Sequence, residues 1–207
     1  IHGLRFRMDP MQGQKTGYYL DQCENAVAVA RHAAGRRVLD CFCNQGGFAL
    51  AAAAAGASEV LAVDTSEVAL ERLQANALLN TLKIQSSQAD AFDWLSAAGR
   101  RGEKFGLVIL DPPSFTRGRQ RVADALRGYR ELHRQAAGLL EPGGLLATFS
   151  CSYHIREEAF LEALREGFHD ARRTAWVRER YQQAQDHPIL LSMPETAYLK
   201  GYLVQAV

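Results

Sequence analysis

Short apolar runs alternate with amphipathic stretches from residue 36 onward. Apolar runs bounded by polar or turn-forming residues predict strands, and apolar residues recurring every three or four positions predict helices. The expected strands cover residues 38–39, 60–63, 84–89, 107–110, 145–149, 172–181 and 198–207. The expected helices cover residues 25–34, 48–55, 67–79, 92–97, 122–140 and 155–168. This alternation predicts an α/β fold with a doubly wound, mostly parallel sheet and right-handed crossovers.

The beginning of the chain differs from this pattern. Residues 4–8 alternate like a short strand, and residues 9–17 are rich in turn formers. Asp21 is a predicted helix cap. Because the first residue is isoleucine, we interpret residues 1–20 as a lead-in from an upstream region and residues 21–207 as the domain itself.

Amino-acid composition excludes few classes of function. With 207 residues the chain suits one large domain, and 24 Lys+Arg against 23 Asp+Glu neither demand nor exclude a nucleic-acid partner. Arginines concentrate between Arg117 and Arg134, which fits either a solvated helix face or a phosphate-binding one. The four cysteines form neither a disulfide framework nor a zinc pattern, so we expect a cytoplasmic protein without a metal. No apolar run is long enough to span a membrane.

The first strand, ending at Asp40, is followed by a glycine-containing turn and a helix. Gly46 and Gly47 at the helix start would let a ligand approach the backbone, and the exposed N–H groups there favour an anionic group. Asn44 and Gln45 stand where a dinucleotide-binding loop would have its earlier glycine, so the G-x-G-x-x-G spacing is absent.

Acids also follow the next three strands. Ligands of such sheets bind at the carboxyl ends of the strands, so Asp40, Asp64, Asp90, Asp111 and Cys151 should share one edge. Asp64 is placed to bind ribose hydroxyls, and it can also take part in the cap of the next helix. Asp90 can accept from an adenine amino group while Phe92 covers the ring, and an N-cap role is nearly as well supported.

The segment Asp111-Pro112-Pro113 is more specific than these single acids. Two prolines directly after a strand lock the backbone and hold the Asp111 side chain rigidly at the sheet edge. The motif is similar to the one with which methyltransferases acting on planar nitrogens or nucleobases hold the target base. Phe115 could stack on that base.

The fifth strand ends at Ser150-Cys151-Ser152. A thiolate can add to C6 of a pyrimidine and make C5 nucleophilic enough to take a methyl group. The competing interpretation is a buried cysteine that acts as a small hydrophobe. The nearby Asp-Pro-Pro segment favours Cys151 as a nucleophile.

These motifs together resemble the RlmI-type bacterial large-subunit ribosomal RNA cytosine-C5 methyltransferases, over essentially the whole chain. The resemblance is carried by segments 15–22, residue 42 with 46–48, and segments 63–66, 111–113, 149–152, 186–188, 194–195 and 198–201. It implies a Rossmann-like class I fold with seven strands, of which the last is antiparallel. It also implies an upstream RNA-binding module that includes a PUA domain.

The resemblance assigns roles to individual residues. Cys151 would be the nucleophile, and Asp111 would contact the cytosine ring beside Pro112, Pro113 and Phe115. The expected binding residues for S-adenosylmethionine, which leaves as S-adenosylhomocysteine, are Gln22, Asp40, Phe42, Asn44, Gly46, Gly47, Asp64, Thr65, Asp90, Ala91, Phe92 and Asp111. The expected partner is RNA, most simply ribosomal RNA, with a homodimer as one option for the oligomeric state.

Three alternatives stay open at this level. Asp-Pro-Pro also fits an N-methyltransferase acting on an RNA base. The fold class also contains nicotinamide-dependent oxidoreductases, against which the missing glycine spacing argues. A non-catalytic RNA-binding relative is the third, because Cys23 replaces the family's usual arginine and Cys43-Asn44-Gln45 replaces its usual Ser-Tyr-Thr.

Overall fold

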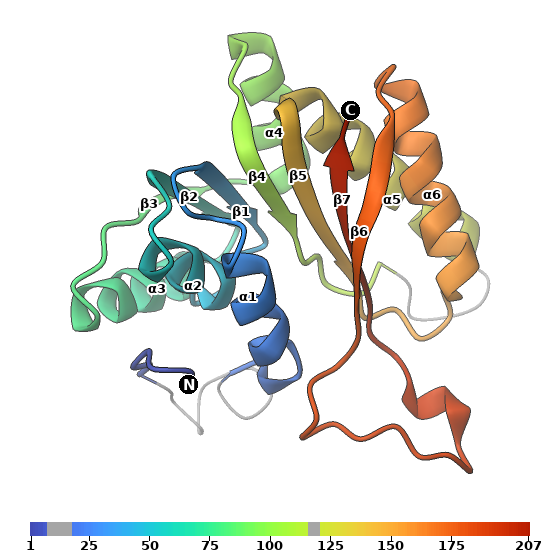
Figure 1. The fold of residues 1–207 in the computed structure, drawn as a ribbon, viewed down its shortest axis with the longest axis horizontal. Coiled ribbons are helices and arrows are strands. Elements are labelled where there is room, and N and C mark those ends of the chain that lie inside the picture. The colour runs from blue at the N-terminus through green and yellow to red at the C-terminus, as the bar shows by residue number, and fades with distance from the viewer. Residues whose placement is uncertain (8–17, 116–120) are drawn as a thin grey trace.

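The computed structural model describes residues 1–7, 18–115 and 121–207 of the chain. This part contains a seven-stranded sheet in the order β3-β2-β1-β4-β5-β7-β6 (Figure 1). The strands are β1 Arg37–Cys41, β2 Glu59–Asp64, β3 Gln85–Gln88, β4 Phe105–Leu110, β5 Leu140–Ser150, β6 Ala175–Tyr181 and β7 Lys200–Ala206. Only β7 is antiparallel to its neighbours, which are β5 and β6. The predicted class I methyltransferase topology, with its antiparallel last strand, is therefore confirmed.

Helices cover both faces of this sheet. One face carries α1 Cys23–Ala30, α2 Gly47–Ala54 and α3 Glu67–Leu79, and the other carries α4 Ala91–Arg101, α5 Val122–Leu139 and α6 Glu157–Asp170. Two short 3-10 helices, Leu20–Gln22 before α1 and Pro194–Thr196 before β7, complete the described elements. Strand order reverses between β1 and β4, whose carboxyl ends therefore flank the expected ligand crevice.

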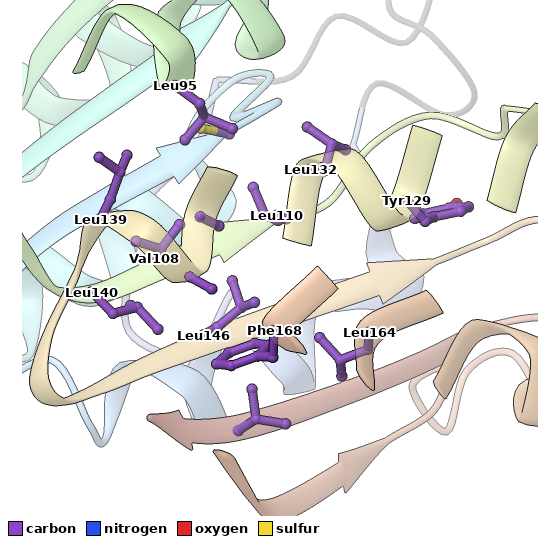
Figure 2. Packing of buried hydrophobic residues seen from close by; sticks show 14 of the residues in the cluster. Leu95, Val108, Leu110, Tyr129, Leu132, Leu139, Leu140, Leu146, Leu164 and Phe168 are labelled. Atoms are coloured by element: carbon purple, nitrogen blue, oxygen red, sulfur yellow. The ribbon is translucent and has the colours of Figure 1, made fainter. Parts of the chain in front are cut away.

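The core between the sheet and α4–α6 is dense (Figure 2). Every residue of β4 is buried, as expected for a central strand that is covered on both faces. Val108 and Leu110 of β4 and Leu146 of β5 pack in the cluster that also holds Leu132 of α5 and Phe168 of α6. This apolar core holds the strand ends that carry the candidate site.

The predicted strand near the start of the chain is wrong for the residues that the structure describes. Residues 4–7 lie along α3, where the backbone N–H of Arg5 donates to Asn80 Oδ1 at 2.9 Å and that of Arg7 donates to Asn76 Oδ1 at 2.8 Å. The backbone N–H groups thus bond to side-chain amides and not to a neighbouring strand, which a β-strand would require. The alternation itself has a cause, since Leu4 and Phe6 pack against the core. Met8 and residues 9–17 lie outside the described residues.

Helix ends also depart from the prediction. Asp21 does not cap α1, which begins only at Cys23, and its Oδ2 instead accepts a hydrogen bond from the Tyr198 hydroxyl at 2.7 Å. Helix α4 runs past the predicted end at residue 97 to Arg101, where Gly102 ends it with a left-handed φ of 71°. Strand β5 begins at Leu140, directly after α5, so it is longer than the predicted 145–149.

The arginine-rich stretch is largely neutralised within the described part of the chain. Arg130 pairs with Asp170 at 2.6 Å and Glu166 at 3.1 Å on α6, Arg134 pairs with Glu131 at 2.6 Å, and Arg127 pairs with Asp124. These contacts favour the solvated helix face over a phosphate-binding one. Arg117 and Arg119 lie outside the described residues. None of the described helices is long and apolar enough to cross a membrane.

Candidate active site

A pocket opens where β1 and β4 end, at the edge of the sheet from which the β6–β7 connection extends in Figure 1. Its lining consists of Tyr18, Tyr19, Gln22, Ala26, Phe42, Cys43, Asn44, Gln45, Gly47, Phe48 and Asp111. Five of these residues were expected to bind the methyl donor: Gln22, Phe42, Asn44, Gly47 and Asp111.

The loop between β1 and α2 is tightly wound. Phe42 and Asn44 have positive φ values of 63° and 48°, which cost a non-glycine residue backbone strain of the kind often stored at functional sites. Gly46 has a φ of 90°, and a Cβ there would lie 2.4 Å from Leu50 Cδ1, so only glycine fits. A Cβ on Gly47 would lie 2.8 Å from the Tyr18 hydroxyl. Gly46 therefore packs against core leucines, whereas Gly47 brings the backbone at the start of α2 to the pocket wall.

Asp40 is the most unusual acid of the site. It is the fourth residue of β1 and is fully buried, and neither of its oxygens has a hydrogen-bond partner among the described residues. Burial raises the pKa of Asp40 well above its usual value, with the negative charge of Asp111 adding to the shift and the nearby Ala49 amide opposing it. An acceptor buried without a partner, behind a loop of glycines and amides, is a feature that a bound polar ligand would explain.

Asp64 and Asp90 hold local structure at the ends of β2 and β3. Asp64 Oδ2 accepts from the backbone N–H of Asn44 at 2.8 Å, and Oδ1 accepts from that of Ser66 at 2.9 Å, while Ser66 caps α3. The carboxylate therefore ties the β1–α2 loop to the end of β2. Asp90 Oδ1 caps α4 by accepting from the N–H groups of Phe92 and Asp93. Asp90 is thus the N-cap of α4, whereas Asp64 bonds to the N–H of Ser66, which itself caps α3, and neither contact tests the expected ligand role.

The other expected residues at this edge lie at different depths. Thr65 is exposed, and Ala91 is buried in the core as the first residue of α4. Phe92 is half-buried, with its ring 6.1 Å from that of Phe115. Pro112 is buried and Pro113 is exposed. Phe92 and Phe115 are therefore neighbours that both pack against the core, where the Phe115 ring also lies 4.7 Å from that of Tyr129.

Asp111 follows β4 directly and is fixed by a neighbour from the other side of the pocket. Gln22 Nε2 donates to Asp111 Oδ1 at 2.9 Å, and Gln22 Oε1 accepts from Asn25 Nδ2 at 2.7 Å. Asn25 also donates to the carbonyl oxygen of Gln182 at 2.9 Å. This relay orients the Gln22 amide with its donor toward Asp111.

Cys151 follows β5 and lies between two fully buried serines. The Tyr129 hydroxyl of α5 donates to Ser150 Oγ at 3.0 Å and lies 3.4 Å from Ser152 Oγ. Ser152 Oγ is also 3.0 Å from Ser114 Oγ, in the segment that follows the two prolines. The backbone on both sides of Cys151 is therefore held, and the segments after β4 and β5 are in contact.

The pKa values of two tyrosines are shifted by the charges of both predicted catalytic residues. The pKa of Tyr19 is raised by burial and then by the negative charges of Asp111 and Cys151, and the pKa of Tyr129 is raised to about 12 by burial, with the same two charges contributing. Cys151 and Asp111 are therefore close enough to act on common neighbours. Tyr19 also lines the pocket, which connects this pair to the loop around Gly47.

Sequence reasoning missed six of the lining residues, which are Tyr18, Tyr19, Ala26, Cys43, Gln45 and Phe48. The signal was present for the two tyrosines, because residues 15–22 form one of the segments that carry the family resemblance. Their roles could not be assigned because the chemistry of a tyrosine ring is generic and only the fold turns the rings toward α2.

Comparison with known proteins bears on the chemistry of this pocket. A family model described as S-adenosylmethionine-dependent methyltransferase matches residues 1–197. The chain belongs to this methyltransferase family. Members use S-adenosylmethionine as the methyl donor, which excludes the oxidoreductase alternative. The residues present fit that donor, because Gly47 brings the backbone to the pocket wall and both oxygens of the buried acid Asp40 lack a hydrogen-bond partner among the described residues.

Several relatives of this chain have names that specify ribosomal RNA. The chain is 42% identical over 204 residues to "Ribosomal RNA large subunit methyltransferase I" of Serratia proteamaculans, and the match covers 97% of this chain and 52% of that protein. It is 44% identical over 209 residues to the protein of the same name from Tolumonas auensis, covering 100% of this chain and 53% of that protein. The chain thus spans about half the length of these relatives.

Two solved structures have folds similar to that of this chain. A candidate methyltransferase solved with S-adenosylhomocysteine, SMU.776, has a TM-score of 0.82 at 26% identity over 92% of this chain and 50% of that one. A candidate methyltransferase from Streptococcus mutans has a TM-score of 0.83 at 25% identity over 94% of this chain and 51% of that one. Among the described residues, no group of three or more His, Cys, Asp or Glu side chains could hold a metal ion.

Proposed function

We propose that this chain is the catalytic domain of an enzyme that methylates C5 of a cytosine in large-subunit ribosomal RNA through a temporary bond to Cys151. The observation that carries the proposal is the contact between the Asp-Pro-Pro segment and the Cys151 segment, next to the Gly47 loop. The relatives support the class of RNA, since their name specifies the large ribosomal subunit. Such a substrate places the reaction in the cytoplasm.

The β1–α2 loop would hold the methyl donor. Gly47 admits it to the start of α2, Gly46 gives the loop its turn, and Asp40, Asp64, Asn44 and Gln22 are proposed as the polar groups around it. Phe42 lines the pocket as an apolar wall. Bound there, the donor supplies an activated methyl group on a sulfonium. Asp90, Ala91 and Phe92 are proposed to meet its adenine, and Thr65 its ribose.

Cys151 and Asp111 would act on the base. The Cys151 sulfur adds to C6, and the electron pair of the C5–C6 double bond becomes available at C5, which is the atom methylated. Solvent water then takes the C5 proton, the electron pair of that C–H bond re-forms the C5–C6 double bond, and the C6–sulfur bond breaks with its electron pair leaving on the cysteine as thiolate. Asp111, oriented by Gln22, holds the ring between Pro112, Pro113 and Phe115.

A trapping experiment tests the covalent step directly. RNA carrying 5-fluorocytidine cannot lose a proton from C5, so the methylated adduct should persist on the protein in denaturing gels. We expect such an adduct with the unaltered chain, joined to any upstream region it needs, and with Cys23→Ala, the matched change at another partly exposed cysteine. We expect none with Cys151→Ala.

Product analysis separates the alternatives. Unmodified ribosomal RNA and labelled donor should yield 5-methylcytidine with the unaltered chain and none with Cys151→Ala. An N-methylated nucleoside that survives Cys151→Ala would favour the N-methyltransferase that uses Asp111-Pro112-Pro113. Failure to bind S-adenosylhomocysteine would favour a non-catalytic RNA-binding relative.

A further inference from the structure

Lys200, the first residue of β7, lies beside the proposed nucleophile. In the antiparallel register of β5 and β7, Lys200 is opposite Ser150, the residue before Cys151. Its side chain is half-buried, and Nζ donates to the carbonyl oxygens of Ser152 and Ile155, both at 2.8 Å. One ammonium therefore closes the turn that begins with Cys151. These bonds hold the turn from β7, whereas Tyr129 contacts the two serines from α5.

The described groups that interact with the Cys151 charge are one lysine and three tyrosines. Burial lowers the pKa of Lys200, and the negative charges of Cys151 and Glu157 oppose that shift. The other described groups whose pKa is shifted by the Cys151 charge are Tyr19, Tyr129 and Tyr198, which remain neutral near pH 7. The charge of Asp111 also raises the pKa of Tyr19 and that of Tyr129, so an acid is a further neighbour of these two rings. Among these described neighbours, Lys200 is the cation.

We infer that Lys200 is a positioning residue for the reaction: it braces the turn over residues 151–155 and stabilises the thiolate form of Cys151. The inference rests on the proposed function, in which that thiolate attacks the base. The bracing carbonyls need only hydrogen-bond donors, whereas the thiolate needs the charge. The described hydrogen bonds of the Lys200 ammonium go to two carbonyl oxygens, and the nearby acid Glu157 accepts a hydrogen bond from the Tyr202 hydroxyl at 2.6 Å, so the ammonium keeps a positive charge beside the sulfur.

Thiol reactivity tests this role without RNA or methyl donor. Iodoacetamide alkylation of the intact chain is followed across pH, and mass mapping of peptides separates Cys151 from Cys23, which serves as an internal reference. Lys200→Gln keeps a donor and removes the charge. We expect it to slow Cys151 alkylation at pH 7 roughly ten-fold and to move the midpoint of the pH profile upward, with Cys23 unchanged. Lys200→Arg should retain most of the rate.

Lys104→Met is the matched control, since Lys104 Nζ donates to the carbonyl of Gly138 away from this turn. It should leave both alkylation rates unchanged. A folded Lys200→Gln chain with the unaltered Cys151 profile would overturn the inference. If Lys200→Gln does not fold, the unaltered chain decides: alkylation of Cys151 should slow with added salt more than that of Cys23, and equal slowing would reject the charge effect.

The two proposals fail separately. The 5-fluorocytidine adduct tests whether Cys151 is the nucleophile, whereas the pH profile of alkylation tests the role of Lys200. If Cys151→Ala retained full activity while Lys200→Gln still slowed alkylation, the covalent mechanism would be rejected and the charge effect of Lys200 on Cys151 would be supported.

Discussion

Gln22 donates a hydrogen bond of 2.9 Å to Asp111 across the mouth of the pocket. The two residues are 89 positions apart in sequence, and the bond joins the 3-10 helix before α1 to the end of β4. Because Asn25 fixes the other end of the Gln22 amide, the donor points at the carboxylate. The proposed base-binding acid is thus oriented by a residue that also lines the proposed donor pocket.

Replacing Gln22 should therefore affect turnover more than folding. Gln22→Leu removes the bond and leaves Asp111 without this donor, at a stability cost of about 1 kcal/mol. We expect methyl transfer to fall roughly ten-fold, mainly in kcat, because the acid loses its fixed orientation. The measurement is single-turnover methylation with labelled donor.

Gln74→Leu provides the control, since Gln74 also donates through Nε2, to Ile84 and Ser86, at a distance from the pocket. Equal effects of the two changes on turnover would contradict a role for Gln22 in orienting Asp111.

The contact between Gly47 and Tyr18 gives a second prediction. Alanine at Gly47 would normally favour the helix, but its Cβ would meet the Tyr18 hydroxyl at 2.8 Å, while the next ring atom is at 3.6 Å. We expect Gly47→Ala to weaken S-adenosylhomocysteine binding roughly ten-fold, about 1.4 kcal/mol. Adding Tyr18→Phe removes the clashing oxygen and should restore much of the affinity, measured by calorimetry. An affinity of Gly47→Ala that Tyr18→Phe leaves unchanged would place the cause elsewhere.

A third prediction concerns Asn76, a fully buried residue of α3. Its side chain accepts from the Arg7 N–H at 2.8 Å and donates to the Gln45 carbonyl at 3.3 Å, so it links the start of the chain to the pocket loop. Asn76→Ala should cost about 2 kcal/mol in urea unfolding, because buried backbone groups lose their partners. It should also reduce the rise in melting temperature that S-adenosylhomocysteine produces.

Asn80→Ala is the comparison for this effect. Asn80 holds Arg5 through two hydrogen bonds, and among the described residues its side chain does not bond to the pocket loop. We expect a smaller loss of stability and an unchanged ligand effect. A ligand effect that is reduced equally in both variants would show that the loop does not depend on Asn76.

Buried His133 predicts acid sensitivity. Burial lowers the pKa of this imidazole to about 4 from 6.5, and its Nε2 is 2.9 Å from Thr148 Oγ1. The unfolded chain binds a proton near pH 6.5 and the folded chain only near pH 4, so stability falls as the pH drops through this window. The loss should reach about 3 kcal/mol.

Urea unfolding between pH 7 and pH 4.5 measures this effect. His133→Gln should flatten the dependence relative to the unaltered chain, whereas His169→Gln, at a largely exposed position, should not. Parallel curves for the unaltered chain and His133→Gln would contradict the assignment.

Much of the fold followed from local patterns. The buried runs around Val38, Val60 and Leu107 predicted central strands because parallel strands covered on both faces are apolar throughout. Boundaries were less accurate where a distant partner decides them. Residues 4–7 alternate like a strand, yet Asn76 and Asn80 take their backbone groups, and Asp21 resembles a cap but binds Tyr198.

The sequence by itself determined the layered α/β architecture, the family and the order in which acids and a cysteine end successive strands. These features depend on periodicity and on short motifs, which are local. Only the tertiary structure decided that Gln22 reaches Asp111, that Ser114 meets Ser152 and that Lys200 closes the turn after Cys151. Such contacts join segments far apart in sequence, and packing of the strands against α5 and the register of β7 set their distances.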